Sequence, residues 1–277
     1  MPERLGQHFL TAEWRERVAE AIFPGFSVPP GDACWIEIGA GHGEMTALLA
    51  QHAERVIAIE LDAGLLPRLR QVAEPLGNVT VVSGDVLELD LGQLAGGRSF
   101  RVYGNLPYYI TSPIVHRLFE SAAKPEAAFV VVQLEVALRL AATPGVRDYG
   151  YLSVFAQFYS RPEILLRIPP GAFHPQPQVE SALVEMRTPG MGAQLDVRDE
   201  PAFLNFVKAC FAQKRKTLRN NLRAMGLHTM GPRSTNESPG SGKGAGELLE
   251  SAGISASARA EELTVDQFAR LFAAPRG

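Results

Sequence analysis

The sequence has little cysteine and no long hydrophobic run. Its 277 residues include two cysteines, Cys34 and Cys210, which lie far apart in the chain, each in an apolar setting. Two isolated cysteines form neither a disulfide framework nor a zinc site, so we expect no metal and a protein of the reducing cytoplasm. No apolar stretch is long enough to cross a membrane, and residues 1–8 lack the apolar core of a signal peptide.

Acidic residues are absent from one segment, although they outnumber basic residues over the whole chain. The net charge is −3, yet residues 201–236 contain seven lysines and arginines and no aspartate or glutamate. This segment therefore carries +7 and the rest of the chain −10. Such an uneven distribution indicates an anion-binding face more strongly than the total charge argues against one.

Strand-like and helix-like patterns alternate along the chain up to about residue 190. Short apolar runs predict buried strands, and the longer amphipathic segments between them predict helices. This alternation is typical of the α/β class with a mostly parallel, doubly wound sheet. The expected strands are 34–38, 55–60, 78–83, 100–104, 126–133 and 179–186, and the expected helices are 44–52, 62–76 and 111–121.

The pattern changes after Arg187, where residues 188–192 resemble a linker. We therefore expect a first domain over residues 1–190 and a small, all-helical domain over 191–277. We also expect a flexible loop over 229–246, followed by short helices near 247–252 and 265–273. One continuous helix is predicted before the loop, with a single apolar stripe formed by Phe203, Val207, Phe211, Leu218 and Leu222.

Glycine and acidic residues follow the first three expected strands. Gly39 and Gly41 come after the first strand, where doubly wound folds let a ligand approach the backbone. Glu60 ends the second strand and can accept hydrogen bonds from ribose hydroxyls, and Asp85 follows the third and can accept from an adenine amino group. Singly, these residues also fit a ligand-free turn, a solvated acid and a helix N-cap. Together they favour an S-adenosylmethionine site.

An NAD site is a weaker interpretation of the same glycines. The third glycine, Gly43, comes one position too early for the dinucleotide pattern Gly-x-Gly-x-x-Gly. No group of residues suited to hydride transfer accompanies it.

The fourth strand is followed by Asn105, Leu106, Pro107 and Tyr108. The Asn105 amide oxygen can accept a hydrogen bond from an exocyclic amino group. Pro107 favours an extended Leu106, which aims the neighbouring carbonyls, and Tyr108 offers a ring for stacking. An ordinary loop with a turn proline and a core tyrosine is the alternative. These four residues suit a flat base with an amino group.

Nearly the whole chain resembles the KsgA/RsmA family of 16S rRNA adenine dimethyltransferases. The resemblance depends on the order and completeness of short motifs that are weak one by one. They are GQHFL from Gly6, EIGAGHGEMT from Glu37, IELD from Ile59, GDV from Gly84, NLPYYITSP from Asn105, YGYLSVFAQ from Tyr149, FHPQPQVESALV from Phe173, QKRKTLRNNL from Gln213 and RAEEL from Arg259. The related Erm enzymes, which methylate 23S rRNA, share several of these motifs.

The resemblance implies a Rossmann-like class I methyltransferase sheet that uses S-adenosylmethionine and releases S-adenosylhomocysteine. From their own surroundings, His8 also fits a surface histidine and Leu10 a core residue. The residues that the resemblance places at or near the cofactor are His8, Leu10, Gly39, Gly41, Glu60, Asp85 and Asn105.

We expect the target adenine to be held by four residues after the fourth strand and by one aromatic residue. Asn105 and the carbonyl of Leu106, or that of Pro107, would accept hydrogen bonds from its amino group, and the methyl transfer would then need positioning more than a base. Tyr108 would stack on one face of the base. Phe173 is the candidate for the other face, and a core aromatic is an equal interpretation of it.

The basic segment predicts contact with RNA phosphates, although scattered basic residues on a helix more often form a solvated face. The candidates are Lys208, Lys214, Arg215, Lys216, Arg219 and Arg223.

Three features of the sequence differ from the family that it resembles. Only five residues precede Gly6, and Leu134 and Gln178 stand where lysine is common, which affects RNA docking more than the chemistry.

The resemblance implies dimethylation of two adjacent adenosines in the loop of the 3′-terminal hairpin of 16S rRNA. The expected partner is this rRNA within the immature small subunit, without DNA or membrane, and the expected state is a monomer. An Erm-type enzyme acting on 23S rRNA and a non-catalytic RNA-binding assembly factor are the alternatives.

Overall fold

The computed structural model describes residues 7–23, 31–213, 216–225 and 243–274. Four features predicted from the sequence lie wholly or mostly outside these residues: Gly6, Lys214, Arg215 and the loop at 229–246. Within the described residues, no helix is both long enough and apolar enough to cross a membrane.

Contacts divide the chain into two compact units. The first unit comprises Met1–Ala137 and Pro162–Thr188, and the second comprises Leu138–Arg161 and Pro189–Gly277. The predicted division at residue 190 therefore differs from the observed one mainly because residues 138–161 belong to the second unit and not to the first. These residues belong with the helical unit because helix α7 (Tyr151–Tyr159) packs there, with the Phe158 ring 5.1 Å from that of Phe203. The Tyr149 hydroxyl also donates to the Leu263 carbonyl at 2.7 Å.

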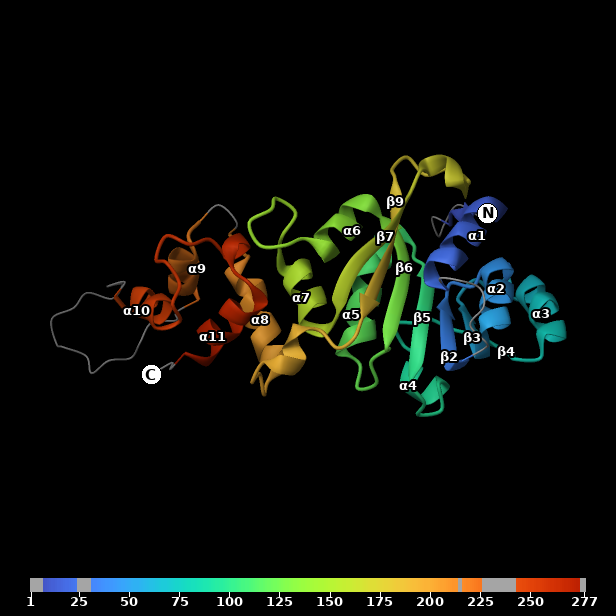
Figure 1. The fold of residues 1–277 in the computed structure, drawn as a ribbon, viewed down its shortest axis with the longest axis horizontal. Helices are drawn as coiled ribbons and strands as arrows, with labels where there is room; N and C mark the ends of the chain where they lie inside the picture. The colour runs from blue at the N-terminus through green and yellow to red at the C-terminus, as the bar shows by residue number, and fades with distance from the viewer. Residues whose placement is uncertain (1–6, 24–30, 214–215, 226–242, 275–277) are drawn as a thin grey trace. The chain divides into compact units, whose positions relative to one another are not determined.

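A seven-stranded sheet forms the centre of the first unit, in the order β4-β3-β2-β5-β6-β9-β7 (Figure 1). The five strands from β4 to β6 are parallel, and β9 runs antiparallel to β6. The predicted strands are confirmed within three residues at each end, whereas β7 was not predicted. The bounds are β2 (Gly31–Ile38), β3 (Ala53–Glu60), β4 (Val79–Ser83), β5 (Phe100–Asn105), β6 (Ala127–Gln133), β7 (Arg161–Ile168) and β9 (Ser181–Arg187).

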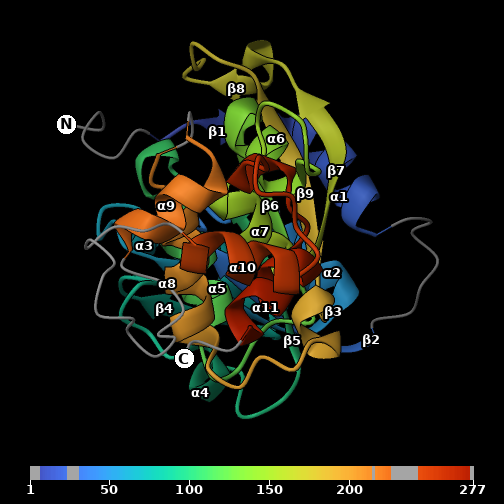
Figure 2. The ribbon, with the colours of Figure 1, turned by 90° about the vertical axis from the view of Figure 1, so that its left-hand side faces the viewer.

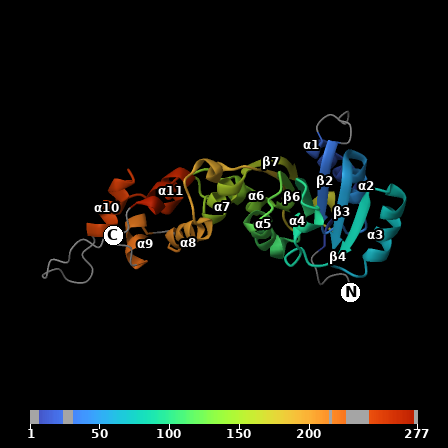
Figure 3. The ribbon, with the colours of Figure 1, turned by 90° about the horizontal axis from the view of Figure 1, so that it is seen from below.

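Helices cover this sheet, and Figure 3 shows α2 and α3 beside β3 and β4. The predicted helix at 44–52 is confirmed as α2, and the one at 62–76 is shorter, because a turn occupies its first residues. The helices are α1 (Ala12–Ile22), α2 (Glu44–His52), α3 (Leu66–Ala73), α4 (Leu91–Leu94), α5 (Thr111–Glu120) and α6 (Leu134–Ala141), with 3₁₀ turns at Glu74–Leu76, Tyr108–Ile110 and Pro170–Ala172.

A separate two-stranded ribbon joins the N-terminal segment to a distant part of the chain. Strand β1 (Phe9–Leu10) pairs antiparallel with β8 (Phe173–His174), and Figure 2 shows the two side by side. Leu10 lies opposite Phe173, and both side chains are buried in the core. The sequence did not predict this pairing, because two residues are too few for a recognisable strand pattern.

The strand order reverses between β2 and β5. From β2 the chain builds outward through β3 to β4, and from β5 it builds the other way to β6. In doubly wound folds, ligands bind at the carboxyl ends of the strands beside such a reversal. Gly39, Glu60, Asp85 and Asn105 all stand at these ends.

The second unit is helical, and its predicted continuous helix is wrong. The segment forms two helices, α8 (Glu200–Cys210) and α9 (Leu218–Ala224), with a turn between them. The buried amide of Asn221 donates to the Cys210 carbonyl at 2.7 Å, which satisfies the end of α8 and brings α9 back beside it. The predicted short helices are confirmed as α10 (Lys243–Ser251) and α11 (Val265–Ala273), and 3₁₀ turns lie at Met191–Gln194 and Ala260–Glu262.

Candidate active site

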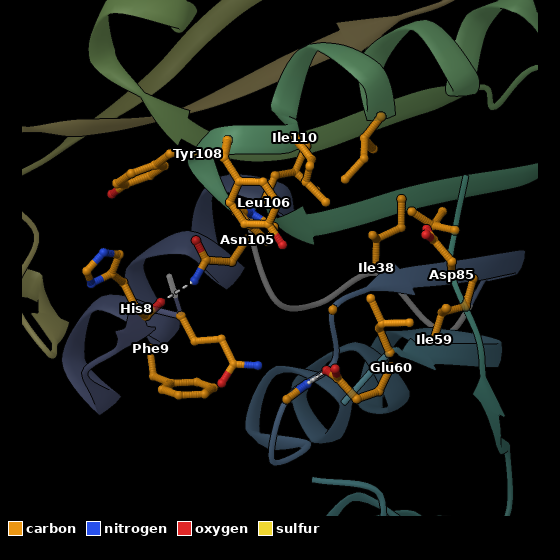
Figure 4. A pocket seen from close by; sticks show the side chains of 18 of the residues that line it. His8, Phe9, Ile38, Ile59, Glu60, Asp85, Asn105, Leu106, Tyr108 and Ile110 are labelled. Carbon is orange, nitrogen blue, oxygen red and sulfur yellow. Dashed lines mark hydrogen bonds between the residues drawn. The ribbon is translucent and has the colours of Figure 1, made fainter. Parts of the chain in front are cut away.

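A pocket lies in the first unit at the carboxyl ends of β2 to β5 (Figure 4). Of the seven cofactor residues predicted from the sequence, six line it, and Leu10 does not. The base-binding candidates from Asn105 to Tyr108 line the same pocket. The remaining lining residues are mostly apolar and include Phe9, Ile38, Ile59, Leu61, Val86, Tyr109, Ile110 and Ile114.

The loop after β2 has a backbone shape that glycine favours. Gly39, Gly41 and Gly43 have φ values of +71°, +60° and +90°, a region that other residues rarely adopt. At Gly39 the added Cβ of another residue would meet no atom within 4 Å, so the pocket is open beside this backbone. At Gly41 it would come within 2.9 Å of the Phe9 ring, which closes over the loop.

Glu60 joins this loop to the end of β3. Its Oε2 accepts a hydrogen bond from the Gly41 amide at 2.7 Å, and its Oε1 accepts one from the Asp62 amide at 2.8 Å. The side chain is buried, and these two bonds hold it in one orientation. A carboxylate has about four acceptor positions, so Glu60 keeps capacity for two hydroxyl donors.

Asp85 stands at the next strand end and is positioned by its own loop. Its Oδ1 accepts a hydrogen bond from the Leu87 amide at 2.9 Å. Ile38 and Ile59, whose side chains lie near it in Figure 4, make this side of the pocket apolar. An apolar slot with a carboxylate at its edge suits a flat heterocycle that carries an amino group.

Asn105 is held by the N-terminal segment. Its Nδ2 donates to the backbone carbonyl of His8 at 2.7 Å (Figure 4). A carbonyl can only accept, so this contact fixes which end of the amide is the NH₂ group and leaves Oδ1 as an acceptor for the pocket. His8 contributes its backbone carbonyl to this contact, which the sequence did not reveal.

The two backbone carbonyls predicted to bind the base differ in their partners. The Pro107 carbonyl accepts hydrogen bonds from the Ile110 amide and the Thr111 hydroxyl, both at 3.2 Å. These two donors occupy both of its lone pairs. The structure therefore favours the Leu106 carbonyl as the acceptor beside Asn105.

Tyr108 is held at both its hydroxyl and its ring. The hydroxyl shares a hydrogen bond with the Ser181 hydroxyl at 2.8 Å. Burial raises the pKa of the phenol, and the contact with Ser181 partly opposes this rise. The His8 ring stacks on Tyr108 at 5.5 Å between centroids, and its Nδ1 is 2.7 Å from the Pro175 carbonyl. The stacked rings of Tyr108 and His8 thus form an aromatic surface beside Asn105 in the pocket.

Phe173 lies in the core and does not line the pocket. Its side chain is 4% exposed and packs in the same cluster as Leu10 and Tyr103. Alternate residues of a strand face opposite sides, so the ribbon that exposes His174 buries Phe173. The position matches the alternative interpretation of Phe173 as a core aromatic.

Glu37 is a buried acid beside the loop after β2, and it was not among the site residues predicted from the sequence. It lies on β2, is 2% exposed and accepts a hydrogen bond from the Thr46 hydroxyl at 2.5 Å. Burial raises the pKa of Glu37 to about 8, with smaller effects from Glu60 and Glu44, and the Thr46 hydrogen bond opposes the rise. An acid within the apolar strand Cys34–Ile38 was the available signal.

Comparison with known proteins decides the family. The family model described as "Ribosomal RNA adenine dimethylase" matches residues 2–238. The "Ribosomal RNA small subunit methyltransferase A" of Acidobacterium capsulatum is 46% identical over 97% of this chain and 89% of that protein. The protein of the same name from Alkaliphilus metalliredigens is 39% identical over 96% of this chain and 89% of that protein.

The chain belongs to the ribosomal RNA adenine dimethylase family. The resemblance predicted from its motifs is therefore confirmed, and so is its assignment as an S-adenosylmethionine-dependent rRNA adenine dimethyltransferase.

Solved structures support the fold of this dimethylase. A dimethyladenosine transferase from Plasmodium falciparum has a TM-score of 0.75 and 21% identity, covering 95% of this chain and 96% of that chain. The 23S rRNA methyltransferase ErmE has a TM-score of 0.66 and 27% identity, covering 95% and 98%. The predicted Rossmann-like sheet with helical elements is confirmed.

The hydrogen-bond acceptors and the open space in the pocket of this dimethylase fit S-adenosylmethionine. Glu60 suits the ribose, the slot beside Asp85 suits adenine, and the open space at Gly39 lets a ligand lie against the backbone. No cluster of three or more metal-ligating side chains occurs among the described residues.

The predicted RNA-binding residues lie in the second unit and do not share one helix. Lys208 is on α8 and Arg223 on α9, while Lys216 is in the turn between them; all three are exposed, and Arg219 is half-buried. Their expected alignment on one side of a continuous helix is lost. Lys214 and Arg215 lie outside the described residues.

Proposed function

We propose that the protein dimethylates N6 of two adjacent adenosines in the loop of the 3′-terminal hairpin of 16S rRNA, during small-subunit assembly. The observation that carries the chemistry is the orientation of Asn105, whose Oδ1 is left for an amino group because Nδ2 is bound to His8. The names of the relatives support the small subunit as the target.

The reaction needs an amino group aimed at an activated methyl group. Adenine N6 is a weak nucleophile because its lone pair is delocalised into the ring. Acceptance of its two hydrogens by Asn105 Oδ1 and the Leu106 carbonyl favours a pyramidal nitrogen whose lone pair points into the pocket. Bound S-adenosylmethionine supplies a methyl group on a positively charged sulfonium. The proton displaced from N6 leaves to solvent, and no side chain here has to act as a strong base.

The base must leave its stack in the RNA to reach Asn105. Tyr108 offsets part of this cost by stacking, with its ring already held by Ser181 and His8. A second stacking role for Phe173 would require its ring to leave the core, so we assign the stacking to Tyr108 alone.

The second unit supplies basic side chains for the rRNA backbone in this proposal. Lys208, Lys216 and Arg223 are exposed and can approach phosphates, while Lys214, Arg215 and Arg219 remain candidates from the sequence. The partner is rRNA within the immature subunit in the cytoplasm, without DNA or membrane. We propose that the protein acts as a monomer.

Labelled methyl transfer tests the proposed substrate. Immature small subunits, mature small subunits and large subunits are each incubated with labelled S-adenosylmethionine, and the Asn105→Ala variant serves as the control. We expect N6,N6-dimethyladenosine in the immature small subunits alone. Label in large subunits would identify an Erm-type enzyme, and RNA binding without label would identify a non-catalytic assembly factor.

A further inference from the structure

Tyr109 is an exposed aromatic residue at the mouth of the pocket. It lines the same pocket as Asn105 and Tyr108, yet its residue surface is 61% exposed. Its chain neighbours Tyr108 and Ile110 lie along one side of the pocket (Figure 4). Single exposed apolar residues are common on protein surfaces, so the informative feature is where Tyr109 lies. A residue that lines a pocket and stays mostly exposed stands at its opening.

The two neighbouring tyrosines differ in what holds their side chains. Tyr108 shares a hydrogen bond with Ser181 and stacks on the His8 ring. Within the described part of the chain, the Tyr109 hydroxyl has no hydrogen-bond partner and its ring contacts no other aromatic ring. The exposed Tyr109 ring can therefore stack on a flat partner from outside the protein.

The backbone that carries Tyr109 is fixed by a short turn. Residues Tyr108–Ile110 form a 3₁₀ turn, and the Ile110 amide donates to the Pro107 carbonyl at 3.2 Å. Helix α5 begins at the next residue, Thr111, whose hydroxyl donates to the same carbonyl. With its backbone fixed, a tyrosine loses little conformational entropy on stacking, because few of its side-chain torsions are free.

The base next to the target adenosine is the partner that suits this position. Consecutive Cα atoms are about 3.8 Å apart, so the segment that brings Tyr108 to the target base also brings Tyr109 close to it. The neighbouring nucleotide is joined covalently to the target and must lie within one nucleotide of the pocket mouth. An aromatic ring can stack on it whatever its sequence, because every base has a π-face.

We propose that Tyr109 stacks on the base adjacent to the adenosine in the pocket, so that two neighbouring tyrosines bind two neighbouring adenosines. This inference rests on the proposed function, since it assigns the position of the second adenosine of the same substrate. Tyr109 then favours RNA in which the base beside the target is also unstacked. It also holds the second adenosine near the pocket while the first is methylated.

Single-turnover methyl transfer to reconstituted immature small subunits tests this assignment. The rate at one adenosine is measured with the other adenosine either intact or replaced by an abasic residue. On the intact RNA, Tyr109→Ala should lower the rate about 10- to 100-fold, the usual effect of removing a stacking side chain. On the abasic RNA, the wild type and Tyr109→Ala should transfer at the same rate, because no base remains to stack. Tyr109→Phe keeps the ring and should match the wild type on both RNAs.

Met191→Ala is the control, because Met191 is also apolar and exposed but does not line the pocket. It should leave both rates unchanged. An equal loss on the two RNAs in Tyr109→Ala would overturn the inference, and so would an unchanged rate on the intact RNA. The affinity of Tyr109→Ala for S-adenosylhomocysteine should equal that of the wild type, and a fall that matched the loss of rate would show that the ring covers the methyl donor instead. If the wild type bound S-adenosylhomocysteine but methylated no intact small subunit, the proposed function itself would fall.

Discussion

The polar side chains of the pocket are held by the backbone, whereas basic side chains of the second unit extend into solvent. Asn105, Glu60 and Asp85 each make at least one hydrogen bond to a backbone group. Lys208 and Lys216 are exposed, on and just after α8. Methyl transfer depends on placing an amino group within a fraction of an ångström, while phosphate contact depends mainly on charge. The two regions should therefore respond very differently to mutation.

The largest effect should come from Asn105→Ala. Loss of the acceptor for the amino group should reduce methyl transfer about 100- to 1000-fold, as for other groups that stabilise a transition state. Single-turnover transfer to immature small subunits measures this. The affinity for S-adenosylhomocysteine should change far less, and near-normal turnover would show that the pocket does not need this fixed amide.

Glu37→Gln should change how stability depends on pH. The folded-state pKa of about 8 lies above the unfolded value near 4.5, so the folded protein binds the extra proton. The folded protein therefore becomes less stable as the pH rises from about 5 to 8. Over this range Glu37 increases the equilibrium constant for unfolding by up to about tenfold per pH unit. Urea unfolding at several pH values should show that Glu37→Gln removes this decline.

Glu13→Gln, at an exposed position, is the control for the loss of one acid. If both variants followed the wild-type pH dependence, the first unit would not contain a buried acid that holds its proton. The pocket and the second unit would then not differ in this respect.

Two substitutions of Tyr108 distinguish the contribution of stacking from that of hydrogen bonding. Tyr108→Ala should reduce transfer about 10- to 100-fold, because a stacked base contributes roughly 1–3 kcal/mol. Tyr108→Phe keeps the ring and loses only the contact with Ser181, so a fall of about two- to tenfold is expected. Equal losses in the two variants, measured by single-turnover transfer, would argue against stacking.

The smallest effect should come from Lys216→Ala. Removal of one phosphate contact should weaken rRNA binding about threefold and reduce the slope of log affinity against log salt by nearly one. Filter binding over a range of salt concentrations measures both. Arg198→Ala, at an exposed arginine outside the basic segment, should leave the slope unchanged. A loss of catalysis at saturating RNA would show that the second unit also needs precise geometry.

The sequence predicted the parts of the fold that depend on local pattern. Strands β2 to β6 and helix α2 follow from runs and periodicities within a few residues of one another. The ribbon between Leu10 and Phe173 joins residues far apart in the chain, and no local pattern reveals it. The break after Cys210 was missed for the same reason, since the Asn221 amide that permits it lies 11 residues away.

The sequence by itself determined the family, the positions of β2 to β6 and β9 along the chain, and the identity of the chemical groups at the strand ends. Those depend on residue types and on their spacing along the chain. Only the tertiary structure decided which atoms face the pocket. Asn105 presents its oxygen because the His8 carbonyl binds its nitrogen, and Phe173 is buried because β8 pairs with β1. Orientation depends on partners distant in sequence, and folding alone brings those partners together.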